Sequence, residues 1–391
     1  MERRFLKTII FISLLITSCQ QIPTNESNKN FVDDNTDKQN LGVNLKKQEK
    51  IISYHSDIWS YILVNSTYTS DSLDEQTLMY MNRHLQDLDK FKEFLNDSYY
   101  FMFFVIEELE NAKLPIELAF LPYIESNYDP FSISSSGAVG MWQFMPRTGR
   151  TYDLERSWWN EDRHDPFKST SAAIKYLKYL YERFDQDLYL TLAAYNAGPS
   201  FLDRQIKRNQ RRGLNTDYWS LDLPIQTRNY VPKFIAIKEL IINSDQYDIE
   251  LPFIPYEPVV AKIEIPGQVE ILTLSEYLNI KPELLYKLNA GYTKWASAPS
   301  EKSVFYIPIE QYDYFQTSEN PFSDSNQINW ISHTVETGDS LWSLARKYDT
   351  EVRIIREINF LENDLLSINA TLLIPLSKTE SNNFIPYEMH I

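Results

Sequence analysis

The sequence predicts a mainly α domain followed by small modules that combine helix and strand. From about residue 51 to residue 244, apolar residues recur at the spacing of helices that bury one side, and no alternating strand pattern of any length interrupts them. Past residue 250 the sequence pattern changes and predicts a linker and short extended segments, marked by Pro252, Pro255, Pro258 and Pro266. The chain has 391 residues, of which 43% are hydrophobic. This suffices for one sizeable core and one or two small domains.

Several helix ends can be placed in the first part of the chain. We expect an N-terminal helical region over 51–97 and a helical domain over 98–244. Within that domain, Asp165-Pro166 has the pattern of an N-cap followed by a proline in the first helical position. A later helix, 188–197, should end at Gly198-Pro199, because glycine stops a helix and proline cannot continue it.

The C-terminal part contains two related units. The spacing from Leu274 to Asn289 equals that from Leu344 to Asn359, and both units end in an apolar pair followed by proline. Each unit is predicted as strand, two short helices and strand, over 259–310 and 331–377.

The N-terminus has the pattern of an export signal. Basic residues precede a short apolar run, 9–16, which is too short to cross a bilayer as a helix. Leu15 to Cys19 resembles a bacterial lipobox, so 1–19 is predicted as a lipoprotein signal peptide and Cys19 as the lipidated residue. A plain signal peptide with an incidental cysteine is the alternative. Cys19 is the only cysteine, so one molecule cannot form a disulfide. Residues 20–50 are polar and predicted to be a disordered tether.

Charge and motif content exclude several functions. The formal net charge is -16, which disfavours nucleic-acid binding and attraction to anionic lipid. The five histidines are scattered, without a metal-binding spacing such as His-Glu-x-x-His, and no phosphate loop is present. We therefore expect no metal and no cofactor.

Glu125 ends an apolar run. Ile116, Phe120 and Ile124 have core-facing helical spacing, which places the next residue at the boundary of the core. A carboxyl group there is partly desolvated, and desolvation raises its pKa and keeps it protonated, as a general acid requires. On position alone, an exposed glutamate or one paired with an arginine is the more common case.

Polar and glycine-rich stretches follow Glu125. Gly137 and Gly140 permit tight turns, Gln143 can both donate and accept hydrogen bonds, and Tyr195-Asn196 puts a phenol and an amide at a helix end. Taken singly, each is explained by packing or capping. In order, the motifs are Glu125-Ser126, Gly140-Met141-Trp142-Gln143, Ala194-Tyr195-Asn196-Ala197-Gly198 and Tyr230.

Together these motifs resemble the lytic transglycosylases with a goose-type, lysozyme-like α-helical fold, and the strings around Glu125, Pro146 and Tyr230 resemble the membrane-bound type D subgroup. The resemblance covers residues from about 98 to 244. It implies that Glu125 is the catalytic acid and then the base. Trp142 stands where many members carry a smaller apolar residue. The positions to which the resemblance assigns saccharide contacts are Ser134, Met141, Gln143, Tyr195, Asn196 and Tyr230.

The resemblance also implies the reaction. Most glycosidases use two carboxylates, but a lytic transglycosylase needs one. That single carboxyl group protonates the oxygen between N-acetylmuramic acid and N-acetylglucosamine. The C6 hydroxyl of the same muramic acid then attacks the anomeric carbon and leaves a 1,6-anhydro end. Two alternatives stay open. One is a hydrolytic muramidase on the same fold, and the other is a non-catalytic peptidoglycan-binding scaffold.

The segment from His333 to Ala345 resembles the opening of a LysM domain, a peptidoglycan-binding module. This implies glycan contacts for Gly338, Asp339, Ser340 and Asn359, although Asp339 and Ser340 also suit a helix cap. The earlier unit, 259–310, lacks the Gly-Asp-Ser turn and is interpreted as a degenerate copy. The expected partners are peptidoglycan glycan strands and, through Cys19, a membrane. The expected location is the periplasmic face of a membrane, as an outer-membrane lipoprotein.

Overall fold

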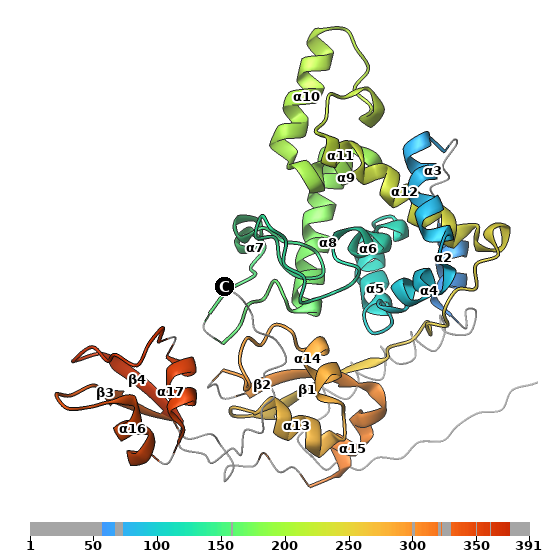
Figure 1. Ribbon diagram of the computed structural model, residues 1–391. Coiled ribbons are helices and arrows are strands. Elements are labelled where there is room, and N and C mark those ends of the chain that lie inside the picture. The colour runs from blue at the N-terminus through green and yellow to red at the C-terminus, as the bar shows by residue number, and fades with distance from the viewer. Residues whose placement is uncertain are drawn as a thin grey trace, which may run out of the picture. The chain divides into compact units, whose positions relative to one another are not determined.

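A computed structural model describes residues 57–66, 73–157, 159–298, 302–319, 322, 330–348, 350–359 and 361–375 (Figure 1). The chain divides into two units, 1–51 and 52–391, and all described residues belong to the second. The predictions for the signal peptide, Cys19 and the tether over 20–50 lie outside the described residues.

The first part of the described chain is helical, as predicted. Asp165 caps its helix by accepting from the backbone N–H groups of Phe167 and Lys168, and Gly198 ends another helix with a positive φ of 86°. The elements are α2 (Ile58–Asn65), α3 (Glu75–Leu85), α4 (Leu88–Asn96), α5 (Met102–Ala112), η1 (Ile116–Phe120), α6 (Leu121–Glu125), α7 (Pro146–Thr151), α8 (Pro166–Arg183), α9 (Leu188–Ala197), α10 (Pro199–Arg211), η2 (Tyr218–Ser220), α11 (Ile225–Arg228), α12 (Tyr230–Ile242) and η3 (Ser244–Tyr247).

One core joins these helices. α12 is apolar on most of its surface, packs against α3 and α9, and buries Val231, Phe234 and Leu240 completely (Figure 1). The N-terminal helices share this core, since Ile58 and Phe91 belong to the same cluster. The described helices of the region predicted as 51–97 therefore pack as part of the helical domain.

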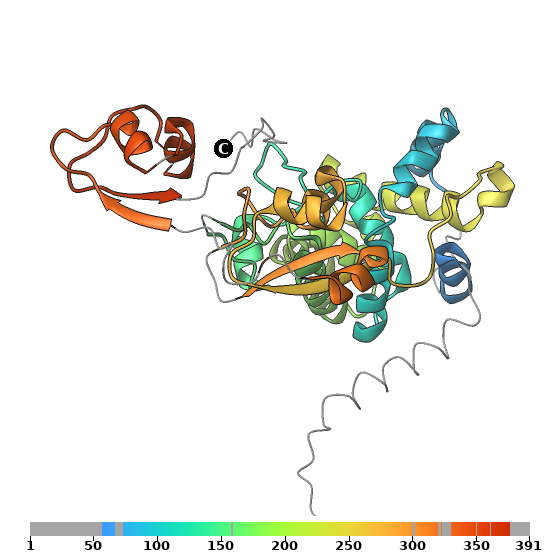
Figure 2. The same cartoon turned by 90° about the horizontal axis from the view of Figure 1, so that it is seen from below.

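Two small modules follow, each with strand, helix, helix and strand in that order. In both figures the two strands of each module lie side by side (Figures 1 and 2). They are antiparallel, with Val260 opposite Pro308 and Trp330 opposite Pro375. The first module contains β1 (Val260–Pro266), α13 (Ile271–Leu278), α14 (Pro282–Leu288), β2 (Lys302–Pro308), η4 (Ile309–Gln311) and α15 (Tyr312–Thr317). The second contains β3 (Trp330–Thr334), α16 (Leu341–Lys347), α17 (Val352–Ile358) and β4 (Thr371–Pro375).

The two modules share one internal hydrogen-bond pattern. Asn289 accepts from the N–H of Tyr306 and donates to its carbonyl, at 2.8 Å each, which ties the end of α14 to β2. Asn359 makes the same pair of bonds with Leu373, at 2.8 and 2.9 Å, and ties α17 to β4. The predicted repeat is thus also a structural repeat.

Loss of either asparagine should loosen its module, and the first module should lose more. Asn289 is buried, so Asn289→Ala leaves buried backbone groups without partners, at a cost of about 1–3 kcal/mol. Asn359 is half-buried, so Asn359→Ala should cost about 0.5–1.5 kcal/mol. Hydrogen exchange of the amides of Tyr306 and Leu373 measures each loss. Equal or unchanged exchange at both amides would contradict this account.

Candidate active site

Glu125 is the last residue of α6, on a rigid apolar support. The residues before it, Leu121 to Tyr123, are buried, and Ser126 caps the helix by donating its backbone N–H to the carbonyl of Pro122 at 3.0 Å. The Ser126 hydroxyl donates to the carbonyl of Met141 at 2.8 Å. Tyr128 adopts a positive φ of 58° just beyond, and its buried hydroxyl donates to the carbonyl of Ala119 at 2.6 Å. Hydrogen bonds from Ser126 and Tyr128 therefore fix the turn that follows Glu125.

The Glu125 carboxyl group is set up for proton transfer. Tyr230, at the start of α12, donates its hydroxyl to Oε1 of Glu125. Burial raises the pKa of Glu125 to about 7, while the Tyr230 bond and the nearby Lys233 cation act in the opposite direction. At neutral pH the side chain is thus near half protonation, where one group can both give and take a proton.

The Tyr195-Asn196 pair lies at the end of α9. Tyr195 donates its hydroxyl to the carbonyl of Trp142 at 2.8 Å, and Asn196 accepts from the Thr227 hydroxyl at 2.9 Å. Burial, together with the charge of the nearby Glu125 carboxyl, raises the pKa of Tyr195 well above its usual value. Four predicted residues, Glu125, Tyr195, Asn196 and Tyr230, are therefore linked to one region.

Gln143 lies in a tightly bonded loop, residues 132–144, which we call the glycan loop. Its Nε2 donates to the carbonyls of Ser132 and Gly140, at 3.2 and 2.9 Å, and its φ is 48°. Ser134 accepts from the N–H of Ala138 at 2.9 Å and so braces the turn next to Gln143. Both side chains are half-buried, and both help to shape the loop.

The expectation that Met141 contacts the saccharide needs correction. The side chains of Met141 and Trp142 have no exposed surface, and the Trp142 indole donates to the Thr170 hydroxyl at 2.8 Å inside the core. Their apolar groups are more stable buried among helices than against a polar ligand. The unusual tryptophan at 142 thus fills the core and presents no face to a sugar.

Sequence reasoning missed two neighbours of the site. Lys233 lies one helical turn after Tyr230, so the spacing Tyr-Val-Pro-Lys could have indicated a cation beside Glu125. Thr227 contacts Asn196 from α11, a different element, and no local pattern in the sequence announces that contact.

In the second module, three of the four residues predicted to contact glycan form hydrogen bonds within the module itself through their side chains. Asp339 accepts from the N–H of Glu336 and from Nε2 of His333, at 2.8 Å each, and these bonds lower its pKa. Ser340 forms a capping box with Ser343 at the start of α16. Gly338 is exposed with a φ of 100°, whereas the Asn359 side chain lies against β4. The turn 338–340 is thus the part of this set that faces solvent.

The described residues bring together no group of three or more His, Cys, Asp or Glu side chains suited to a metal ion. Within the described ranges, every helix is too short or too polar to span a lipid bilayer.

Residues 103–217 match the Transglycosylase SLT domain, and residues 333–375 match the LysM domain. Over 340 residues the chain is 29% identical to membrane-bound lytic murein transglycosylase D of Escherichia coli, which covers 83% of this chain and 74% of that protein. Over 108 residues it is 33% identical to membrane-bound lytic murein transglycosylase F of Alcanivorax borkumensis, which covers 26% of this chain and 22% of that protein. A solved structure of an inactive mutant of the lytic transglycosylase Slt from Pseudomonas aeruginosa is 22% identical, with a TM-score of 0.31, over 39% of this chain and 25% of that one.

Glu125→Gln should stabilise the helical domain more at pH 8 than at pH 5. The unfolded carboxyl ionises near 4.5 and the folded one near 7, so the wild-type protein loses stability as the pH rises between these values. Glutamine carries no charge, so its advantage should grow by about 2 to 3 kcal/mol between pH 5 and pH 8. Urea unfolding at both pH values measures the difference, with Glu93→Gln on the exposed face of α4 as control. An equal effect at the two pH values would refute the shifted pKa.

Proposed function

We propose that this chain cleaves peptidoglycan between N-acetylmuramic acid and N-acetylglucosamine and leaves a 1,6-anhydro end. The chain carries an SLT transglycosylase domain followed by a LysM domain and so belongs to the lytic transglycosylases. The observation that carries the proposal is the single half-buried carboxyl of Glu125, which is bonded to Tyr230 and has a pKa of about 7.

Three acidic residues that follow Glu125 in the sequence have structural partners, which supports a mechanism with one carboxylate. Glu161 pairs with Arg163 at 2.8 Å, Asp162 pairs with Lys168 at 2.7 Å, and Asp165 caps α8. These groups hold loops and helices together, and none of these contacts involves Glu125. A retaining or inverting hydrolase needs a second carboxylate about 5 to 10 Å from the first.

The proposed reaction balances with Glu125 alone. Protonated Glu125 gives its proton to the glycosidic oxygen as the bond to the anomeric carbon breaks. The C6 hydroxyl of the same muramic acid attacks that carbon, and its proton returns to the carboxylate. Because the nucleophile belongs to the substrate, its effective concentration is high without a bound water. Tyr230 holds the carboxyl in place, while Gln143, Ser134, Tyr195 and Asn196 are proposed to hold the saccharide.

The LysM module is proposed to bind glycan through its exposed turn, Gly338 to Ser340. A binding module on the same chain raises the local concentration of glycan at the catalytic domain. Asn359 contributes indirectly in this account, because it fixes β4.

Glu125→Gln should abolish cleavage of purified sacculi while the fold persists. Loss of the proton donor should lower the rate by about 10²- to 10⁴-fold. The matched control is Asp129→Asn, which keeps the oxygen that accepts from the N–H of Phe131 and should stay active. Mass spectrometry of the products separates the alternatives, because an anhydro end is lighter than a reducing end by one water. A reducing end would favour the muramidase, and full activity of Glu125→Gln would remove Glu125 from its role.

We also propose a lipid anchor on Cys19 and a location at the periplasmic face of the outer membrane. Cys19→Ala should release the protein from membranes, because it removes the residue that would carry the acyl chains. Stable anchoring requires more than one such chain. Fractionation of cells that express each form measures this, with Ser18→Ala as control. Retention of the Cys19→Ala variant in the membrane fraction would contradict the anchor.

A further inference from the structure

Residues 159–165, which we call the brace segment, lie between the glycan loop and the first module. We propose that the first module is a buttress for the glycan loop, and that Arg163 is the positioning residue that passes this support to Gln143. The inference rests on the proposed function, because it takes Gln143 as a saccharide contact.

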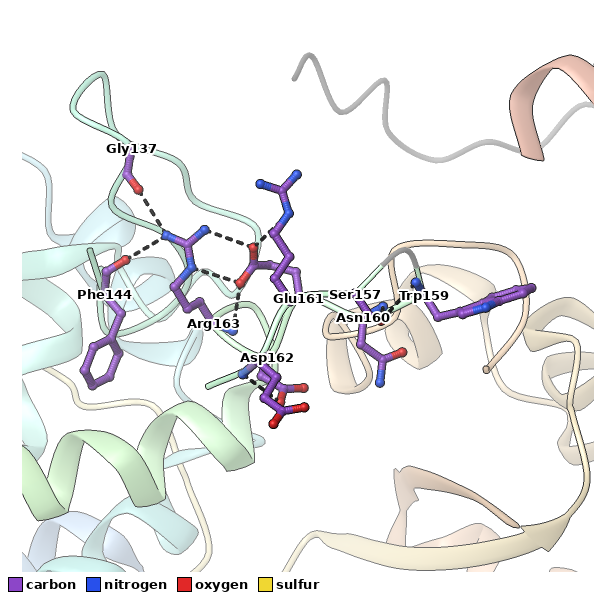
Figure 3. Close-up of polar contacts among 10 residues, drawn as sticks. Gly137, Phe144, Ser157, Trp159, Asn160, Glu161, Asp162 and Arg163 are labelled. Atoms are coloured by element: carbon purple, nitrogen blue, oxygen red, sulfur yellow. Dashed lines mark hydrogen bonds and ion pairs between the residues drawn. The ribbon is translucent and has the colours of Figure 1, made fainter. Parts of the chain in front are cut away.

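Arg163 holds the glycan loop at two points. Its Nη1 donates to the carbonyls of Gly137 and Phe144, at 3.2 and 3.1 Å (Figure 3). Gly137 precedes Gln143 in the sequence and Phe144 follows it. Nε and Nη2 of Arg163 donate to the two carboxylate oxygens of Glu161, at 2.8 and 2.9 Å. These two parallel bonds form a fork that fixes the orientation of the guanidinium. The remaining N–H donors, on Nη1, then point at the loop.

The backbone of the brace segment also touches the loop. A Cβ on Gly140 would meet the carbonyl oxygen of Arg163 at 1.9 Å, so only glycine allows this approach. The His164 side chain adds a contact just before the loop, since its Nδ1 lies 2.6 Å from the carbonyl oxygen of Pro130. The course of the loop therefore depends on where the brace segment lies.

The Glu161–Arg163 pair is buried and ionised. Each residue is 7% exposed or less, and the bonds from Arg163 lower the pKa of Glu161 although burial alone would raise it. The Coulombic gain of a buried pair is largely offset by desolvation, so its contribution is more to geometry than to net stability.

The first module contacts the opposite side of the brace segment. The N–H of Glu161 donates to the carbonyl of Gly291, and the N–H of Thr293 donates to the carbonyl of Trp159, at 2.9 Å each. Asn160 and Tyr292 form a β-bridge between these two bonds. The module's loop after α14 thus adds a short piece of sheet to the brace segment.

A second contact fixes the module on α8, the helix that follows the brace segment. Tyr306 of β2 stacks on Phe167 with ring centroids 3.7 Å apart, and Asn289 holds the backbone of Tyr306. Leu288 of α14 is fully buried in the core of the helical domain. We call the loop after α14, which contacts the brace segment, the docking loop. Since Asn289 and Asn359 are equivalent in the two modules, the docking loop corresponds to the loop after α17 in the second module. In the first module it is committed to an intramolecular contact.

The test disturbs each end of this connection separately. In Gly291→Val, a side chain enters where a Cβ lies only 2.8 Å from the Cβ of Asp165, which should lift the module's loop without touching Arg163. Arg163→Lys keeps the charge and removes the fork. Each variant should lose roughly 10- to 100-fold in kcat/KM on soluble glycan strands, because a misplaced contact residue weakens substrate positioning. The matched control is Glu264→Val, an exposed strand position of the same module, which should behave as wild type.

The loss should appear in KM, while the pH dependence of kcat, set by Glu125, stays unchanged. Partial unfolding would instead lower kcat and leave KM alone. Hydrogen exchange of the Val139 and Phe144 amides, which bond to each other's carbonyls, gives a readout independent of activity and should accelerate in both variants.

An unchanged KM in either variant, with unchanged exchange in the loop, would overturn the inference. If Gly291→Val does not fold, Tyr306→Leu removes the stacking on Phe167 and carries the same expectation. Failure of the proposed function would look different, because the wild-type protein would then give no product, whereas this inference is judged by the ratio of each variant to an active wild type.

Discussion

The contact between Tyr230 and Glu125 joins two distant parts of the helical domain at the site of the proposed chemistry. Glu125 ends the short helix α6 and Tyr230 begins α12, a helix in which 10 of 13 residues are buried. Helix packing of this density allows little movement. A carboxyl group held against that core loses water, and the loss of water raises its pKa toward neutrality. The proposed acid–base role therefore depends on a packing arrangement as much as on the residue itself.

The glycan loop shows how irregular backbone is supported here. It contains left-handed residues, Gly140 and Gln143 among them, that would not persist in isolation. Side-chain donors supply the support, from the buried Arg163 to two carbonyls and from the half-buried Ser126 to a third. Polar groups inside the domain are thus used to hold a loop in one shape.

The two βααβ modules share an architecture and differ in what their loops contact. Both use an asparagine to pin the second helix to the last strand. The first module's docking loop bonds to the helical domain, whereas the second module presents the exposed turn 338–340. One framework can serve as a support in one place and as a proposed binding module in another, because its loops are free to vary while its core is not.

Local patterns in the sequence were enough for the helices and the repeat, whereas the candidate acid came from the family resemblance of several ordered motifs. Helical periodicity, the Asp165 cap and the Gly198 stop depend on near neighbours, so these features could be read directly. The placement of Met141 in the core, the Thr227 contact with Asn196 and the Arg163 fork join residues from different elements. Their positions follow from how whole helices and loops pack against one another, and a contact between particular distant residues leaves no local pattern in a single sequence. Distant contacts of this kind also set the pKa of Glu125, which a sequence can suggest only as a direction.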